Sequence, residues 1–324
     1  MFDTVAVMAL LFLAALGAWL ASKVRGARNR VLKWDGLVFS GLLTVLCTVV
    51  LAVALVGFYK FNFPPSRPPV IEVQLARTPD QVARGARFAA YCPFCHSPTG
   101  KVPLIGQNFS EGGPPIGTLY ASNLTPAGEI KDWSDGEVIR AIREGVHKNG
   151  RPLIIMPAEI FRYLSDTDVQ AIVAYLRTQP AAGTPTPPTR LNVLGALFIG
   201  AGLAPTSAQA PITEPVVAPP EGPTLEYGKY LVSILGCRLC HGENLAGRPP
   251  GKPGPPVGPN LTVILPNWTA EEFAHTLRTG VDPYGRTLGE GMPWKQISAF
   301  GSDADLTAIY SYLHDLTPAE GPTK

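Results

Sequence analysis

Two copies of the pattern Cys-x-x-Cys-His constrain the fold of this 324-residue chain more than any other feature of its sequence. They occupy residues 92–96 and 237–241, and each is followed by the same ordered series of short motifs. Self-similarity of this kind is the signature of a repeated structural unit. The sequence therefore predicts two copies of one module.

The shared motifs are an Asn-Leu-Thr, a five-residue segment from Trp to Glu, an Arg-x-Gly-Val, a Met-Pro and a closing Ser-Asp-x-Asp. In the first copy they begin at Asn123, Trp133, Arg143, Met156 and Ser165. In the second copy they begin at Asn260, Trp268, Arg278, Met292 and Ser302. With the cysteines these make six landmarks in one order, too many to be explained by coincidence.

Each module is expected to consist of a few helices joined by long loops, an all-α fold. Thr78 followed by Pro79 is typical of a helix start, and Ser134 and Thr269 each precede a glutamate at the spacing of a capping box. Ser165 and Ser302 are expected to cap the last helices. One apolar face of the first of these helices is formed by Val169, Ile172, Val173 and Leu176. No strand pattern of comparable strength is present.

The paired cysteines indicate covalent haem attachment. Two thiols one helical turn apart reach the two vinyl groups of a haem, and the histidine that follows then points at the iron. The expected attachment residues are Cys92, Cys95, Cys237 and Cys240, and the expected iron ligands are His96 and His241. A thioredoxin-like redox dithiol would sit in a βαβ setting, and a zinc site of four cysteines would have no use for the trailing histidines. Two covalently attached c-type haems are therefore expected.

Met156 and Met292 are expected to be the second axial ligands. They follow the proximal histidines by 60 and 51 residues, each precedes a proline, and the two remaining methionines lie in the apolar N-terminal region. An iron bound by histidine and methionine is coordinatively saturated and suited to electron transfer. The other histidines do not align between the repeats and are expected to be surface residues; they are His147, His275 and His314.

Residues around the haem ligands suggest further roles. The carbonyl of Pro259 is a candidate acceptor for the ring N–H of His241, and Ser122 occupies the equivalent position in the first module. Arg143 and Arg278 recur in the repeat. They could pair with haem propionates, or equally lie on a solvated helix face.

The N-terminal region predicts a transmembrane helical hairpin. Val5–Ala21 is an apolar run of 17 residues and Leu37–Tyr59 one of 23, against about 20 needed to span a bilayer. Basic residues concentrate between them: Lys23, Arg25, Arg28, Arg30 and Lys33. The positive-inside rule places that loop in the cytoplasm and everything after Tyr59 outside. A cleavable signal peptide is the alternative for the first run, although no basic residue precedes it. Cys47, in mid-span, is expected to be a packing residue.

The expected organisation is an anchor at 1–60, haem domains at 76–180 and 222–318, and a linker rich in proline and alanine at 181–221. Within that linker, Leu191–Ala204 is apolar but too short, at 14 residues, to span a membrane. It is expected to pack between the modules or against a partner, with a membrane-surface segment as the alternative.

These residues resemble the class I cytochrome c family over residues 76–180 and 222–318. The segments 121–126, 133–137, 143–146 and 164–176 are similar to the cytochrome subunits of membrane-bound alcohol and gluconate dehydrogenases, which usually carry three haem modules instead of two. The plan of an anchor and two haem modules also resembles the dihaem subunit of cbb-type oxidases. Either resemblance implies a non-catalytic electron-transfer subunit of a larger membrane complex.

The favoured hypothesis is a cytochrome in the bacterial inner membrane that carries single electrons on the periplasmic side. Its expected partners are the other subunits of a membrane redox complex, a soluble or membrane-bound electron donor or acceptor, and the lipid bilayer. A dihaem enzyme such as a peroxidase, which needs an open iron position, is one alternative; a purely structural subunit is another. A net charge of +2 and no basic stripe argue against nucleic acid.

Overall fold

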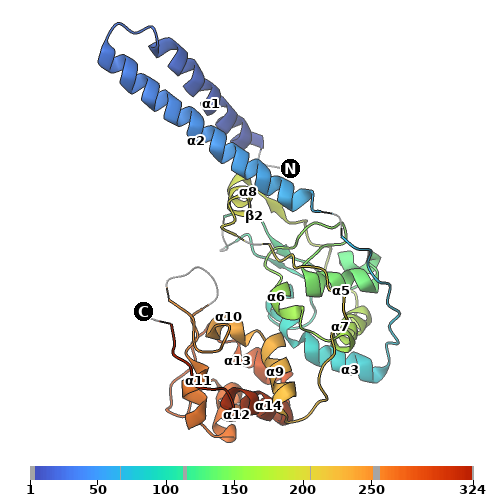
Figure 1. Ribbon diagram of the computed structural model, residues 1–324. Coiled ribbons are helices and arrows are strands. Elements are labelled where there is room, and N and C mark those ends of the chain that lie inside the picture. Colours follow the sequence, from blue (N-terminus) through green and yellow to red (C-terminus); the bar gives the residue numbers. More distant parts are fainter. Residues whose placement is uncertain (1–3, 66, 112–114, 205, 251–255, 323–324) are drawn as a thin grey trace.

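The structure is a computed structural model that describes residues 4–65, 67–111, 115–204, 206–250 and 256–322. It is mostly helical, with a long N-terminal helical hairpin projecting from two compact helical units (Figure 1). The first unit carries the first Cys-x-x-Cys-His motif and the second unit carries the second. The predicted all-α fold of two haem modules is thus confirmed in outline.

The hairpin consists of α1 (Thr4–Val24) and α2 (Arg30–Asn62), packed antiparallel. The side chain of Asn29 accepts from two backbone N–H groups at the start of α2. A Cβ on Gly17 would lie 3.0 Å from the carbonyl oxygen of Ser40, so the two backbones approach closely there. Both helices are long and apolar enough to cross a membrane, and most of their apolar side chains are exposed.

The first unit is built from short elements around the cysteine motif. Its helices are α3 (Pro79–Phe88), η1 (Ala89–Tyr91), α4 (Cys92–His96), η2 (Glu129–Asp132), α5 (Asp135–Glu144), α6 (Ala158–Phe161) and α7 (Asp166–Thr178). The second unit repeats the plan with α9 (Leu225–Ile234), α10 (Cys237–His241), α11 (Leu261–Ile264), η3 (Leu265–Asn267), α12 (Ala270–Thr279), α13 (Trp294–Phe300) and α14 (Asp303–His314).

The first and last helices of each unit cross at a glycine. A Cβ on Gly85 would overlap the carbonyl of Ala171 on α7, and a Cβ on Gly228 would overlap the carbonyl of Ala308 on α14. The expected capping boxes at Ser134 and Thr269 are present, and Ser165 and Ser302 cap α7 and α14. The repeat in the sequence is therefore also a repeat in the structure.

The Asn-Leu-Thr motif explains how each unit closes. The side-chain amide of Asn123 donates to the carbonyl of Ala182 at 2.8 Å, and that of Asn260 donates to the carbonyl of Ala319 at 2.7 Å. In both units the motif thereby ties the loop after the haem-binding helix to the chain leaving the last helix.

Two short antiparallel strand pairs add to the helices. β1 (Gln107–Asn108) pairs with β3 (Tyr120–Ala121), and β2 (Gly117–Thr118) pairs with β4 (Arg190–Leu191). β4 lies in the expected linker and leads into α8 (Val193–Gly200). The linker therefore returns to the first unit before it continues to the second.

Helix α8 packs against the C-terminal part of α2, beside the first unit (Figure 1). The expectation that Leu191–Ala204 packs between the two modules was therefore wrong for its helical part. The physical reason is that small residues on both helices let the two backbones come into contact. Gly57 on α2 meets Ala196 and Gly200 on α8 closely enough for backbone contact.

Candidate haem sites

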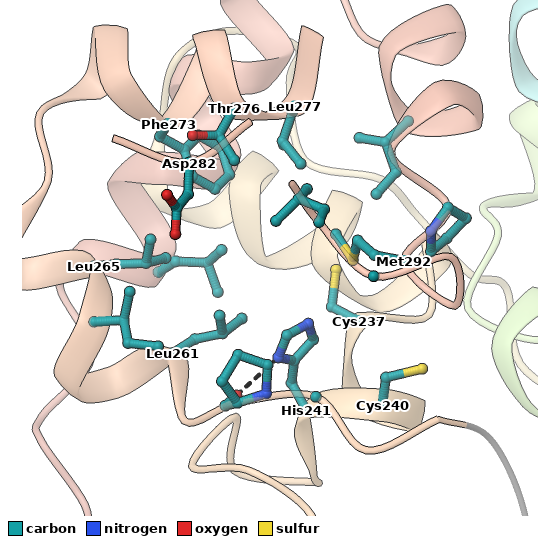
Figure 2. Close-up of a pocket in the computed structure, with 18 of the residues that line it drawn as sticks. Cys237, Cys240, His241, Leu261, Leu265, Phe273, Thr276, Leu277, Asp282 and Met292 are labelled. Carbon is teal, nitrogen blue, oxygen red and sulfur yellow. Dashed lines mark hydrogen bonds between the residues drawn. The ribbon is translucent and has the colours of Figure 1, made fainter. Parts of the chain in front are cut away.

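A cavity of about 310 Å³ opens next to α10 in the second unit. Cys237, Cys240 and His241 line it, together with Met292 (Figure 2). The rest of its wall is largely apolar and includes Leu261, Leu265, Phe273, Leu277 and Ile297. In Figure 2 His241, Cys237 and Met292 share one space with the labelled apolar side chains, whereas the thiol of Cys240 points away from it. The structure thus brings together all four residues that the sequence predicted for the second site.

The imidazole of His241 is oriented by a backbone carbonyl. Its Nδ1–H donates to the oxygen of Pro259 at 2.8 Å, the acceptor expected from the sequence. In the first unit the Nδ1–H of His96 donates to the oxygen of Ser122 at 2.7 Å. Such a hydrogen bond fixes the tautomer and leaves Nε2 as the free nitrogen for a metal ion. The two histidines are therefore presented in the same way.

The electrostatics agree with this role. Burial lowers the pKa of His96, although the hydrogen bond to Ser122 opposes the shift. Burial likewise lowers the pKa of His241, opposed by the bond to Pro259. Each ring is then neutral near pH 7, which is the form that can coordinate iron.

The backbone carbonyl of each histidine is also held, by a hydrogen bond from a glycine further along the chain. The N–H of Gly106 donates to the carbonyl of His96, and the N–H of Gly247 donates to that of His241, each at 2.8 Å. Gly258 lies directly against the second imidazole, where a Cβ would come within 2.7 Å of Nδ1 of His241. Only a residue without a side chain leaves this ring undisturbed.

Each attachment pair lies one helical turn apart on one short helix, α4 or α10. Burial raises the pKa of Cys92 to about 12 and that of Cys237 to about 11. As free groups these cysteines are therefore neutral thiols in largely apolar surroundings. An apolar wall with two thiols at its edge matches the porphyrin faces and vinyl groups of a haem.

The predicted methionines occupy equivalent positions. Met292 lines the cavity with His241, and Met156 packs half-buried against the apolar core. In both cases the methionine carbonyl accepts at 2.8 Å from the N–H two residues later, in Ala158 and Trp294. The two segments therefore share one backbone turn, while ligation of iron by Met156 and Met292 stays a prediction.

The indole of Trp268 provides a test of whether a haem fits the second cavity. Trp268 lines the cavity, and its Nε1–H is buried without a hydrogen-bond partner among the described residues. A buried donor of this kind needs an acceptor. The haem propionates would supply one, so the residues present fit the group. Trp268 recurs in the repeat as the counterpart of Trp133, and its role could have been suspected from that recurrence.

The recurring arginines have other partners. Arg143 donates to the carboxylate of Asp166 at 2.5 Å, and Arg278 donates to that of Asp303 at 2.9 Å. Both arginines thus join the middle helix to the start of the last helix. Arg143 is buried and so does not lie on a solvated face, and its Nε and one of its Nη atoms have no hydrogen-bond partner among the described residues. Pairing with a haem propionate stays a prediction.

The three remaining histidines were expected at the surface. His275 and His314 are exposed, but His147 is half-buried. Its ring packs edge-on against Trp133, and its Nε2 lies 3.3 Å from the carboxylate of Glu129. That interaction could not be read from the sequence because the two residues are brought together only by the fold.

Tyr91 is a residue that the sequence did not single out, although it directly precedes the first attachment cysteine. Its hydroxyl is buried and has no hydrogen-bond partner among the described residues. Burial and, to a lesser extent, the nearby Cys237 raise the pKa of Tyr91. Tyr91, Cys92 and Cys237 all pack against one apolar core that includes residues of both units.

The fold and the two sites define a c-type cytochrome with two haem domains. A protein-family model described as cytochrome c oxidase, cbb3-type, subunit III matches residues 80–176 and 223–313, and the chain belongs to this cytochrome c family. The matched segments coincide with the two helical units.

The chain is also similar to subunits of several dehydrogenases. It is 30% identical over 253 residues to a subunit of the nicotinate dehydrogenase of Pseudomonas putida, covering 72% of this chain and 21% of that protein. It is 36% identical over 165 residues to the gluconate 2-dehydrogenase cytochrome c subunit of Pantoea cypripedii, covering 47% and 35%. It is 28% identical over 284 residues to the cytochrome c subunit of the quinone alcohol dehydrogenase of Gluconacetobacter polyoxogenes, covering 75% and 58%. The chain thus spans a fifth to three fifths of these relatives.

Proposed function

We propose that the chain is a membrane-anchored dihaem cytochrome that carries single electrons on the periplasmic side of a bacterial inner membrane. In this proposal residues 1–60 form the anchor, 76–180 and 222–318 form the haem domains, and 181–221 join them. The chain itself transforms no substrate; its role is to accept and deliver electrons within a larger redox complex.

The shape of the hairpin supports membrane anchoring. Helices α1 and α2 expose apolar side chains along most of their length, which a water-soluble hairpin would bury. The basic loop that joins them lies at the tip farthest from the haem units (Figure 1). By the positive-inside rule this tip is cytoplasmic, so both haem units lie on the opposite, periplasmic side.

For the iron ligands we propose His96 with Met156 and His241 with Met292. A covalently bound haem supplies an iron that changes its charge by one electron. In each unit the histidine and the methionine would hold the iron through an imidazole nitrogen and a thioether sulfur, which would leave no open position for a substrate. The apolar wall excludes water, and the carbonyls of Ser122 and Pro259 keep both imidazoles in one orientation.

The observation that carries the proposal is the closeness of the two attachment segments. Tyr91 and Cys92 of the first unit and Cys237 of the second pack against the same apolar core, and η1 contacts α13. On the same side, the side chain of Ile160 packs against Gly236, where a Cβ would lie 2.5 Å from the Ile160 Cδ1 atom. Two redox sites packed together in this way favour direct transfer from one to the other.

We propose a membrane-bound dehydrogenase as the electron donor. The relatives that match most of this chain include a nicotinate dehydrogenase subunit and a cytochrome c subunit of a quinone alcohol dehydrogenase. The electron-carrier role of a cytochrome subunit can be transferred to this chain because the family match covers both haem units. The substrates of these relatives are not carried over, because the chain spans only part of each.

The proposal is tested by replacing each methionine separately in the full-length protein. Met156→Ala and Met292→Ala should each lower one of the two potentials and halve the methionine-to-iron absorption band at the red end of the oxidised spectrum. Met8→Leu, on exposed α1, is the control and should change neither. A high-spin iron in the unmodified protein together with peroxide turnover would instead establish a dihaem peroxidase.

A further inference from the structure

We propose that α8 and the turn after it, residues 193–203, insert into the outer leaflet of the bilayer as a third membrane element that does not span it. This inference rests on the proposed anchor and goes beyond it. The partner of this segment is the acyl-chain region of the bilayer. The membrane would then hold the first haem unit directly, and not only through α2.

The depth of α8 in the proposed membrane follows from its contacts with α2. A Cβ on Gly200 would overlap the carbonyl of Val53, and one on Gly57 would overlap the carbonyl of Ala196. Val53 and Gly57 belong to the last turns of the apolar run 37–59. Because that run is slightly longer than a bilayer requires, these turns lie at the outer boundary of the hydrocarbon region.

Helix α1 gives an independent measure of that depth. The hydroxyl of Thr44 on α2 lies 3.5 Å from the carbonyl of Ala14 on α1. In an antiparallel pair this register places Thr4, the first residue of α1, at about the level of Ala54. Helix α8 is therefore level with the outer end of both proposed spans.

The segment itself is apolar on both its inward and its outward side. No charged residue occurs between Leu191 and Ala204. Its inward side is filled by a small cluster in which Ile199 and Leu191 pack with Phe61 of α2. Its outward side exposes Leu194 by 37% and Leu203 by 74%.

The part of α2 that α8 contacts also exposes apolar residues. Leu55, Val56 and Tyr59 lie within the same turns of α2 that α8 contacts, and they are exposed by 48%, 47% and 63%. Exposed apolar side chains on both helices at the edge of a membrane span are stable when covered by acyl chains. The tyrosine is the residue type typical of the membrane–water interface.

Hydrogen bonds also connect the start of α8 to the first haem unit. Asn192 begins α8, and its side-chain amide donates to the carbonyl of Pro115 at 2.9 Å. Its backbone N–H donates to the carbonyl of Ile116 at 3.1 Å. The pairing of β4 with β2 continues this attachment. A membrane-inserted α8 would therefore fix the first unit at the bilayer surface.

Spin labels in the full-length haem-loaded protein test this directly. In a Cys47→Ala background, single cysteines replace Leu194 and Leu203, with Val45 on α2 and Val217 in the linker as controls. The protein is placed in nanodiscs of bacterial phospholipid. Collision with oxygen, which dissolves in lipid, is compared with collision with a water-soluble nickel chelate. Haem absorption spectra confirm that each variant is folded.

Labels at Leu194 and Leu203 should behave like the label at Val45, with an oxygen-to-nickel ratio several-fold above that at Val217. If both behave like Val217 while Val45 stays lipid-exposed, the insertion of α8 is overturned and the anchor stands. If Val45 is also water-exposed, the proposed anchor itself fails. Labels shielded from both reagents would show a protein partner on α8 and would also overturn the inference.

Discussion

The guanidinium group of Arg87 donates to the carboxylate of Asp305 at 2.7 Å, an ion pair that joins the first helix of one haem unit to the last helix of the other. The reverse contact is made at the equivalent positions, where the hydroxyl of Tyr230 donates to the carboxylate of Asp168. Because Asp168 and Asp305 occupy the same place in the repeat, the two units dock with an approximate two-fold symmetry. Phe88 and Phe300 meet edge-to-face in this interface, with ring centroids 5.2 Å apart.

Replacing Arg87 by methionine should destabilise the docked pair of units. Asp305 is 3% exposed, so loss of its cationic partner leaves a buried carboxylate that only its own helix cap satisfies. We expect a loss of roughly 2 kcal/mol in the free energy of unfolding, the range of a hydrogen bond to a charged group, measured by denaturant titration of the haem-loaded protein. Arg77→Met is the control, because Arg77 pairs with Asp135 at the surface and should contribute less than about 1 kcal/mol.

Tyr230→Phe should weaken the same interface from the other side. The lost hydroxyl donates to Asp168 and accepts from the N–H of Ser165 at 3.1 Å. Asp168 is fully buried but keeps Arg84, so we expect a loss of about 1–2 kcal/mol in unfolding free energy. Tyr163→Phe, at an exposed tyrosine, should be neutral in the same assay. Equal effects of the two substitutions would contradict the role given to Tyr230.

Features that depend on neighbours in the chain could be predicted from the sequence. The capping boxes at Ser134 and Thr269 form as expected because each needs only a few successive residues. The carbonyl of Pro259 meets His241 because the repeat preserves the loop that brings them together. The second site likewise contains Met292 beside His241, as the spacing suggested.

Features that depend on how units dock could not be predicted. Arg143 carries a charge that could have served a propionate, and only the folded chain shows that Asp166 is its partner. Helix α8 was known to be apolar, but its position on α2 follows from a match of glycine and alanine backbones. The two-fold contact of Arg87 and Tyr230 joins different residue types at equivalent positions, so sequence comparison of the repeats does not reveal it.

The docking of the two units should also depend on pH through Glu221. Burial by itself would raise the pKa of Glu221, but a hydrogen bond from Arg84 and the charges of Arg84 and Arg87 outweigh it and lower that pKa. A carboxyl with a lowered folded-state pKa stabilises the fold fully above its ordinary value of 4.5. That contribution is lost as the pH falls through the folded-state pKa.

Thermal unfolding at pH 7 and at pH 4 should therefore separate Glu221→Gln from the unmodified protein. The substituted protein is expected to lose less stability between the two pH values, because it lacks the carboxylate whose protonation breaks the contact. Glu226→Gln, on the exposed first turn of α9, should follow the unmodified protein. A common pH dependence of all three proteins would exclude Glu221 as a source of the effect.

Gly258→Ala should change the potential of the second haem and leave the first unchanged. The new Cβ would lie 2.7 Å from Nδ1 and 2.8 Å from Cε1 of His241, so the imidazole has to tilt away from the carbonyl of Pro259. Loss of that hydrogen bond makes the ring a weaker electron donor, which destabilises the oxidised iron and raises its potential.

Gly289→Ala is a matched control in the wall of the same cavity, because a Cβ there meets no atom within 4 Å. A redox titration that resolves the two haems should show a positive shift of one centre in Gly258→Ala and no shift in Gly289→Ala. Identical titrations for both variants would mean that the contact between Gly258 and the ring does not control the iron.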